Sequence, residues 1–193
     1  GTNGDVVAHK SIFTLLLEFM NRNPTSKGVP VNFSGEVDPK GDVAYFPRCL
    51  DFFDCFLDVG VSFHDIGDST IRLLNKIGVK PRLLPMKCCG HDALWQGSRK
   101  TFDLARRYNE DLIAKSGIKT LVTSCAECYR TFSKDYELDV QVQHTSQMLE
   151  KETAKLGLQG RDLKIAFHDP CRLGRHMGVY DAPRTVLTRV QGV

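Results

Sequence analysis

Residues 120–136 read TLVTSCAECYRTFSKDY, and this stretch decides the fold class. The run from Thr120 to Thr123 is apolar and β-branched, which predicts a short strand. Cys125-Ala126-Glu127-Cys128 follows the strand, and the pattern from Ala126 to Tyr136 predicts a helix. A strand that leads at once into a helix is the repeating unit of a parallel α/β sheet.

The same alternation extends to both sides of this stretch. We predict further strands at 43–47, 79–84, 140–142 and 163–167. We predict helices from the cap Asp68-Ser69-Thr70 to Ile77, at 92–116 and at 147–155, with an earlier amphipathic helix at 8–22 and a loop at 24–40. Right-handed crossovers then give a mainly parallel sheet flanked by helices, in a Rossmann-like three-layer arrangement.

Composition narrows the function classes. The 193 residues are 41% hydrophobic and 25% charged, with a net charge of +3, which is ordinary for a globular protein and argues against nucleic acid as a partner. The longest apolar run, Ile12 to Leu17, is too short to span a membrane, and no secretory signal opens the chain. Because the chain starts at Gly1 without a methionine, we expect a processed or engineered fragment.

Seven cysteines carry the chemistry of the sequence. Cys49, Cys88-Cys89, Cys125 and Cys171 each come shortly after a predicted strand. The carboxyl ends of parallel strands share one edge of a sheet, where ligands bind, so we expect these thiols to converge there. Helix N-termini at that edge favour the negative charge of thiolates. Cys55 has no such position, and we expect it to be packed inside the protein.

Three kinds of site remain open from spacing alone. An iron–sulfur centre uses cysteine thiolates and accounts for most of the thiols. A structural zinc site needs four ligands, and the adjacent pair Cys88-Cys89 suits tetrahedral closure poorly. A dithiol redox site uses Cys-x-x-Cys at a helix N-terminus, but it leaves Cys49, Cys88 and Cys89 without a role.

The cysteine pattern resembles the cysteine-rich CCG motif, with Cys49, then Cys88-Cys89-Gly90, then Cys125-x-x-Cys128. This motif marks the catalytic subunits of heterodisulfide reductases and the iron–sulfur subunits of glycolate and lactate oxidation systems. Other segments also resemble family blocks, namely 65–70, 122–125, 128–131, 144–146 and 168–175. The resemblance covers roughly residues 43–187.

The resemblance implies a ligand set and a domain division. Cys49, Cys88, Cys89, Cys125 and Cys128 would hold an iron–sulfur cluster, [4Fe–4S], in the noncubane form that heterodisulfide reductases use. Members of the family usually carry two copies of the motif, and Cys171 would begin the second. We therefore expect an N-terminal helix and linker at 1–40, a complete first CCG domain at 41–160 and a truncated second repeat at 161–193.

The implied function is an iron–sulfur redox module of a heterodisulfide-reductase-like oxidoreductase. It would transfer electrons and reduce a small disulfide, or accept electrons from a hydroxy-acid dehydrogenase. His168 is a candidate proton donor to a leaving thiolate, although a backbone-orienting role is the stronger expectation. The implied partners are ferredoxin-like, flavin or haem subunits, and we expect a cytoplasmic protein that reaches a membrane only through a partner. The alternatives are a zinc-stabilised docking domain without catalysis and a metal-free dithiol oxidoreductase.

Overall fold

The structure is a computed structural model that describes residues 8–23, 32–47, 49–160, 162–190 and 192. Parts of the predicted N-terminal helix and linker, residues 1–7 and 24–31, lie outside the described residues.

The described residues form a parallel sheet of four strands in the order β2-β1-β3-β4. The strands are β1 (Val43–Phe46), β2 (Arg82–Leu83), β3 (Thr120–Thr123) and β4 (Gln141–His144). All three neighbouring pairs run parallel. The predicted parallel α/β sheet is therefore confirmed, and β3 has the predicted bounds.

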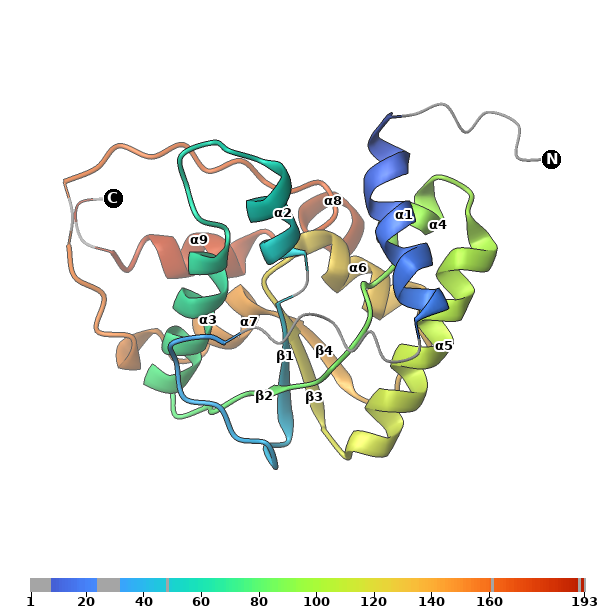
Figure 1. Cartoon of the computed structure of the whole chain (residues 1–193). Helices are drawn as coiled ribbons and strands as arrows, with labels where there is room; N and C mark the ends of the chain where they lie inside the picture. The colour runs from blue at the N-terminus through green and yellow to red at the C-terminus, as the bar shows by residue number, and fades with distance from the viewer. Residues whose placement is uncertain (1–7, 24–31, 48, 161, 191, 193) are drawn as a thin grey trace.

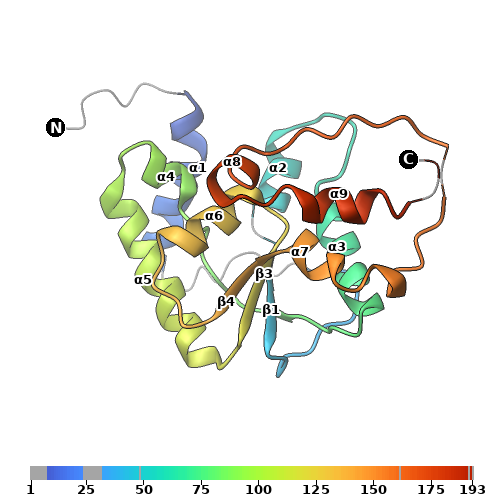
Figure 2. The same ribbon diagram turned by 180° about the vertical axis from the view of Figure 1, so that it is seen from behind.

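Helices cover both faces of the sheet (Figure 1). One face carries four helices, α1 (Ala8–Arg22), α4 (His91–Trp95), α5 (Arg99–Ser116) and α6 (Ala126–Lys134). The other carries α3 (His64–Lys76), α7 (Thr145–Glu150) and α9 (Asp181–Leu187). Figure 2 shows α9 lying over α7 on that second face. Three short helices complete the described chain, α2 (Leu50–Phe56), the 3-10 helix η1 (Thr153–Lys155) and α8 (Gly174–Met177).

Strand alternation divides the core into two apolar clusters. Ala44, Phe46 and Leu121 face the α1, α4, α5 and α6 side, where they pack with Phe102 and Phe132. Tyr45 points the other way and packs with the apolar residues of α3 and α7, Ile71, Leu74 and Leu149. A side-chain period of two along each strand produces this division, and it gives the three layers that the sequence predicts.

The prediction of a fifth strand at 163–167 is wrong. The segment belongs to a long coil around the rim of the molecule (Figures 1 and 2), and the side chains of Leu163, Ile165 and Phe167 are 51%, 50% and 41% exposed. Its apolar alternation suits a strand, but no strand of the described sheet pairs with it. Cys171 therefore follows a coil rather than a strand.

Several helix boundaries also differ from the prediction. The predicted helix at 147–155 is α7, which begins at Thr145 and ends at Glu150, followed by the 3-10 helix η1. The predicted helix at 92–116 is divided into α4 and α5, because Gly97 adopts a positive φ of 85°. Helix α3 begins at His64 rather than at Asp68, because the Asp54 carboxylate of α2 accepts hydrogen bonds from the backbone N–H groups of Phe63 and His64. Asp68 instead accepts from the backbone N–H of Ser34.

Candidate functional site

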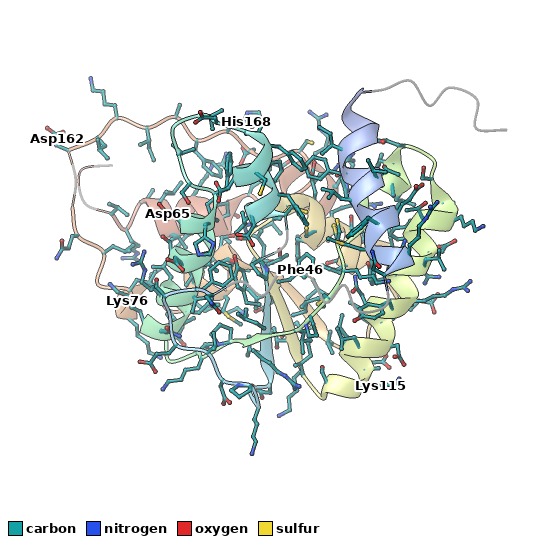
Figure 3. All side chains as sticks on the ribbon, in the orientation of Figure 1. Phe46, Asp65, Lys76, Lys115, Asp162 and His168 are labelled. Atoms are coloured by element: carbon teal, nitrogen blue, oxygen red, sulfur yellow. The ribbon has the colours of Figure 1, made fainter. Side chains whose placement is uncertain are left out.

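The ends of β1 and β3 lie side by side and bring two cysteine loops together. Phe46 pairs with Thr123 in the register of the two strands. The Thr123 hydroxyl donates to the Phe46 carbonyl at 3.2 Å and accepts from the Cys125 N–H at 3.3 Å. This hydroxyl ties the turn that carries Cys125 to the end of β1, three residues before Cys49. Figure 3 labels Phe46 at this end of the sheet, with yellow sulfur atoms just beyond it.

Cys125 occupies the N-cap of α6, as the strand–helix junction predicts. Its sulfur accepts from the backbone N–H of Cys128 at 3.4 Å, which is the position that a Ser or Asp side chain takes in an ordinary helix cap. The backbone N–H groups of the first turn and the dipole of the helix stabilise negative charge there. Accordingly the pKa of Cys125 is lowered, chiefly by its side-chain hydrogen bond with Cys128, which together with backbone N–H groups outweighs the opposing effect of burial.

The five motif thiols form one connected group. The Cys49 and Cys88 sulfurs are 3.8 Å apart, and the Cys128 thiol donates to the Cys89 sulfur at 3.3 Å. Cys88, Cys89 and Cys128 are buried, whereas Cys49 and Cys125 are partly exposed. None of the five forms a disulfide. The structure thus brings together every residue that we predicted for the complete site.

Crowding keeps most of these thiols protonated. The pKa of Cys49 is raised well above its ordinary value by the hydrogen bond with Cys88, by burial and by the neighbouring thiols. The pKa of Cys128 is raised in the same way by Cys125, Cys89 and burial. At Cys89 the hydrogen bond from Cys128 lowers the pKa. The hydrogen bond with Cys88, burial and the neighbouring thiols raise it by more, so the pKa of Cys89 is also well above its ordinary value. Thiols must lose their protons to bind a metal, and the thiolates so formed would repel one another. The positive charge of bound metal ions would offset that repulsion.

Within the group, the Cys49 and Cys88 sulfurs form one close pair and the Cys89 and Cys128 sulfurs form a second, with Cys125 beside Cys128. Within the described residues, no three His, Cys, Asp or Glu side chains form a group that would hold a single metal ion.

Three other predicted residues lie at the surface of the protein. Cys171 is exposed, and so is His168, which Figure 3 labels at the upper rim of the molecule. The catalytic role of His168 and the second site at Cys171 stay predictions. The expectation that Cys55 is packed inside the protein is wrong, because it is exposed on α2.

His91 lies next to the thiols as a buried, neutral side chain. Its Nδ1 is 3.2 Å from the Thr131 hydroxyl, and its Nε2 is 3.5 Å from a Glu127 carboxylate oxygen. Burial lowers its pKa to about 4, and the positive charges of Arg172 and Arg130 lower it further. These two guanidinium groups lie 3.6 and 5.1 Å from the Trp95 ring.

Sequence reasoning missed two buried residues next to the site, Asn109 and Tyr136. Asn109 is wholly buried on α5, among Phe102, Ala105 and Ile113. A polar residue on the apolar stripe of an amphipathic helix is the signal that would have found it. Tyr136 donates a hydrogen bond to the backbone carbonyl of Cys89 at 3.0 Å.

Comparison with known proteins accounts for this cysteine arrangement. Residues 43–133 match the family model described as the CCG cysteine-rich domain. Residues 43–133 of the chain therefore carry a CCG cysteine-rich domain. The matched CCG domain contains all five thiols of the group and the ends of β1 and β3 that carry them.

Curated relatives extend the similarity beyond the CCG domain. The chain is 33% identical over 172 residues to a subunit of the dihydromethanophenazine:CoB–CoM heterodisulfide reductase of Methanosarcina mazei, covering 82% of this chain and 40% of that protein. It is 33% identical over 191 residues to the EtfAB:quinone oxidoreductase of Syntrophomonas wolfei, covering 90% and 27%. It is 30% identical over 151 residues to an uncharacterised iron–sulfur protein of Methanocaldococcus jannaschii, covering 77% and 29%.

The chain thus spans about 40% of the length of the heterodisulfide reductase proteins that it matches. No solved structure shows a significant match. Among the helices of the described segments, none combines the length and the apolar character that a membrane span requires.

Proposed function

We propose that the five thiols of the CCG domain hold an iron–sulfur cluster and that the chain is a redox module of a larger oxidoreductase. The observation that carries this proposal is the convergence of Cys49, the Cys88–Cys89 pair and the Cys125–Cys128 pair from three separate loops. Thiolates are the protein ligands of iron–sulfur clusters. The names of the relatives, which are oxidoreductases and an iron–sulfur protein, support the same function.

The donor set fits such a cluster in number, charge and access. Five thiols outside any disulfide exceed the four that a structural zinc ion takes. Cys125 supplies a thiol of lowered pKa at a helix N-terminus, whereas Cys49, Cys89 and Cys128 must release protons on binding. Cys49 and Cys125 are partly exposed, which gives the metal an entry path.

The finer part of the proposal concerns the reaction. A [4Fe–4S] centre of the noncubane type would supply one-electron chemistry at this edge. The chain would then serve the reduction of a small disulfide, or the acceptance of electrons from a hydroxy-acid dehydrogenase. Ferredoxin-like, flavin or haem subunits would be its redox partners, in the cytoplasm or at a membrane through one of them. His168 as a proton donor and Cys171 as the start of a second site belong to the same proposal.

Anaerobic reconstitution with ferrous iron and sulfide tests the cluster, with three cysteine variants. Cys89→Ser should lose most of the bound iron and sulfide, because a hydroxyl is a poor replacement for a thiolate at iron. Cys55→Ser and Cys171→Ser are matched controls, since both cysteines are exposed, and they should load like the wild type. Loss of the cluster in Cys171→Ser with retention in Cys89→Ser would overturn the assignment. One zinc per chain and no iron would favour the docking-domain alternative.

A dithiol oxidoreductase is the second candidate, and the lowered pKa of Cys125 beside Cys128 favours it. It predicts that the metal-free chain reduces a disulfide substrate and that Cys125→Ser abolishes this activity. The cluster proposal predicts no turnover without metal.

A further inference from the structure

Two buried side chains, Asn109 and Tyr136, form hydrogen bonds with the backbone of residues 87–89. The Asn109 Oδ1 accepts from the Lys87 N–H at 2.7 Å, and the Asn109 Nδ2 donates to the Lys87 carbonyl at 3.1 Å and the Cys88 carbonyl at 3.4 Å. The Tyr136 hydroxyl donates to the Cys89 carbonyl at 3.0 Å. Three successive carbonyl groups are therefore bonded to two side chains, one from α5 and one from the turn that follows α6.

The direction of every bond in this network is fixed. Because Oδ1 of Asn109 accepts from a backbone N–H, its Nδ2 must face the carbonyl groups. The two N–H groups of Nδ2 are shared among three acceptors, the Lys87 and Cys88 carbonyls and the Tyr136 hydroxyl at 3.2 Å, so the hydroxyl proton is left for the Cys89 carbonyl. A network whose members are all satisfied is rigid and specifies a single arrangement.

This rigidity matters because Cys88 and Cys89 are adjacent in sequence but their sulfurs contact different cysteines. The Cys88 sulfur lies 3.8 Å from Cys49, and the Cys89 sulfur lies 3.3 Å from Cys128. A turn of the 87–89 backbone would exchange or separate these pairs. Gly90 follows Cys89 directly and has a positive φ of 78°. This conformation fixes the path of the backbone from Cys89 into α4.

We propose that Asn109 and Tyr136 are positioning residues that hold the 87–89 backbone so that the Cys88 thiol meets Cys49 and the Cys89 thiol meets Cys128. The assignment of these thiols as cluster ligands rests on the proposed function, but the pairing itself is a property of the metal-free chain. The two can therefore be tested separately.

Disulfide mapping of the metal-free chain tests the pairing. The background is the triple variant Cys55→Ser, Cys125→Ser, Cys171→Ser, which leaves Cys49, Cys88, Cys89 and Cys128 with three ways to form two disulfides. Diamide takes up two electrons and two protons for each disulfide that forms, and peptide mass spectrometry then identifies the pairs. We expect Cys49–Cys88 with Cys89–Cys128 to dominate.

Tyr136→Phe removes only the hydroxyl that holds the Cys89 carbonyl. We expect it to lower the ratio of the dominant pairing to the other two about fivefold, the factor that one hydrogen bond contributes. Asn109→Asp, which places an oxygen against two carbonyl groups, should lower the ratio further. Tyr108→Phe is the matched control, because its hydroxyl donates to the Pro85 carbonyl on the same loop, at 3.4 Å, and bonds none of residues 87–89.

The result that would overturn the proposal is a folded Tyr136→Phe protein, judged by circular dichroism, whose pairing ratio equals that of Tyr108→Phe. If Asn109→Asp does not fold, Tyr136→Phe alone decides. A second measurement uses the full chain after anaerobic reconstitution, where Tyr136→Phe should release iron to a chelator several times faster than Tyr108→Phe. Failure of every variant and of the wild type to load iron would overturn the proposed function and leave the pairing result standing.

Discussion

Replacing Gly90 by alanine should cost stability in two ways, through backbone strain and through a steric clash. Replacing Gly117 by alanine should bring the backbone strain alone. Gly90 has a φ of 78°, and a Cβ added there would lie 2.7 Å from the Cδ2 atom of Phe102. Gly117 has a φ of 73°, and a Cβ added there would meet nothing within 4 Å. Both substitutions therefore bring the backbone cost of a left-handed residue, and Gly90→Ala alone brings a steric clash.

The expected losses of stability follow from these contacts. A left-handed conformation costs an L-residue about 1–2 kcal/mol, which is the whole effect expected for Gly117→Ala. Phe102 is 1% exposed and packs edge-on against Tyr136, so its ring has no free space to move into. Overpacking of a buried site adds about 1–3 kcal/mol, so Gly90→Ala should lose roughly 2–5 kcal/mol.

Urea unfolding of the metal-free chain under reducing conditions measures both variants against the wild type. The decisive quantity is the difference between the two free energies of unfolding, expected at about 1–3 kcal/mol. Equal losses for Gly90→Ala and Gly117→Ala would show that Phe102 yields without cost and would refute the reasoning. Adding Phe102→Leu to Gly90→Ala should restore part of the lost free energy of unfolding, because it shortens the side chain that the new Cβ meets.

Two histidines should make stability depend on pH in opposite directions. Burial lowers the pKa of His144 to about 4, so its contribution is complete above the ordinary value of 6.5 and is lost as the pH falls through about 4. His144→Asn keeps an acceptor at the helix cap, and it should reduce the loss of free energy of unfolding between about pH 6.5 and 4 by at most about 3 kcal/mol. The same loss in the variant and the wild type would contradict the prediction. The pKa of His64 is raised by its hydrogen bond with Asp51, so its contribution is complete below 6.5 and is lost as the pH rises through the folded-state pKa. Asp51→Asn should therefore reduce the fall in the free energy of unfolding between about pH 6 and 8, measured by urea titration.

The sequence predicts the sheet and the cysteine positions because both depend on local pattern and chain order. The run from Thr120 to Thr123 has the composition of a strand, and β3 has these bounds. The cysteines follow strands, and parallel topology then places Cys49, Cys88, Cys89 and Cys125 at one edge without further information.

Features that depend on distant contacts could not be predicted. Helix α2 has no buried residue, and the Phe53 ring holds it by packing against Phe13 and Phe63 from two other segments. The segment at 163–167 has the right alternation for a strand, but a strand also needs a neighbour for its backbone groups, and alternation does not supply one. Asn109 stands out in the sequence as a polar residue on an apolar helix stripe, but the backbone groups that it holds, at Lys87 and Cys88, could be identified only from the structure.

Cys49 has a φ of 75°, and every other described residue with a positive φ is a glycine. A method that redesigns the chain for thermal stability, by choosing the residue that best suits each backbone angle, would put glycine at this position and would count the change as an improvement of about 1–2 kcal/mol. That redesigned protein would be more robust and would lack one of its five thiols. At residue 49, thermal stability and the thiol that the proposed cluster would use place opposing demands on the same side chain.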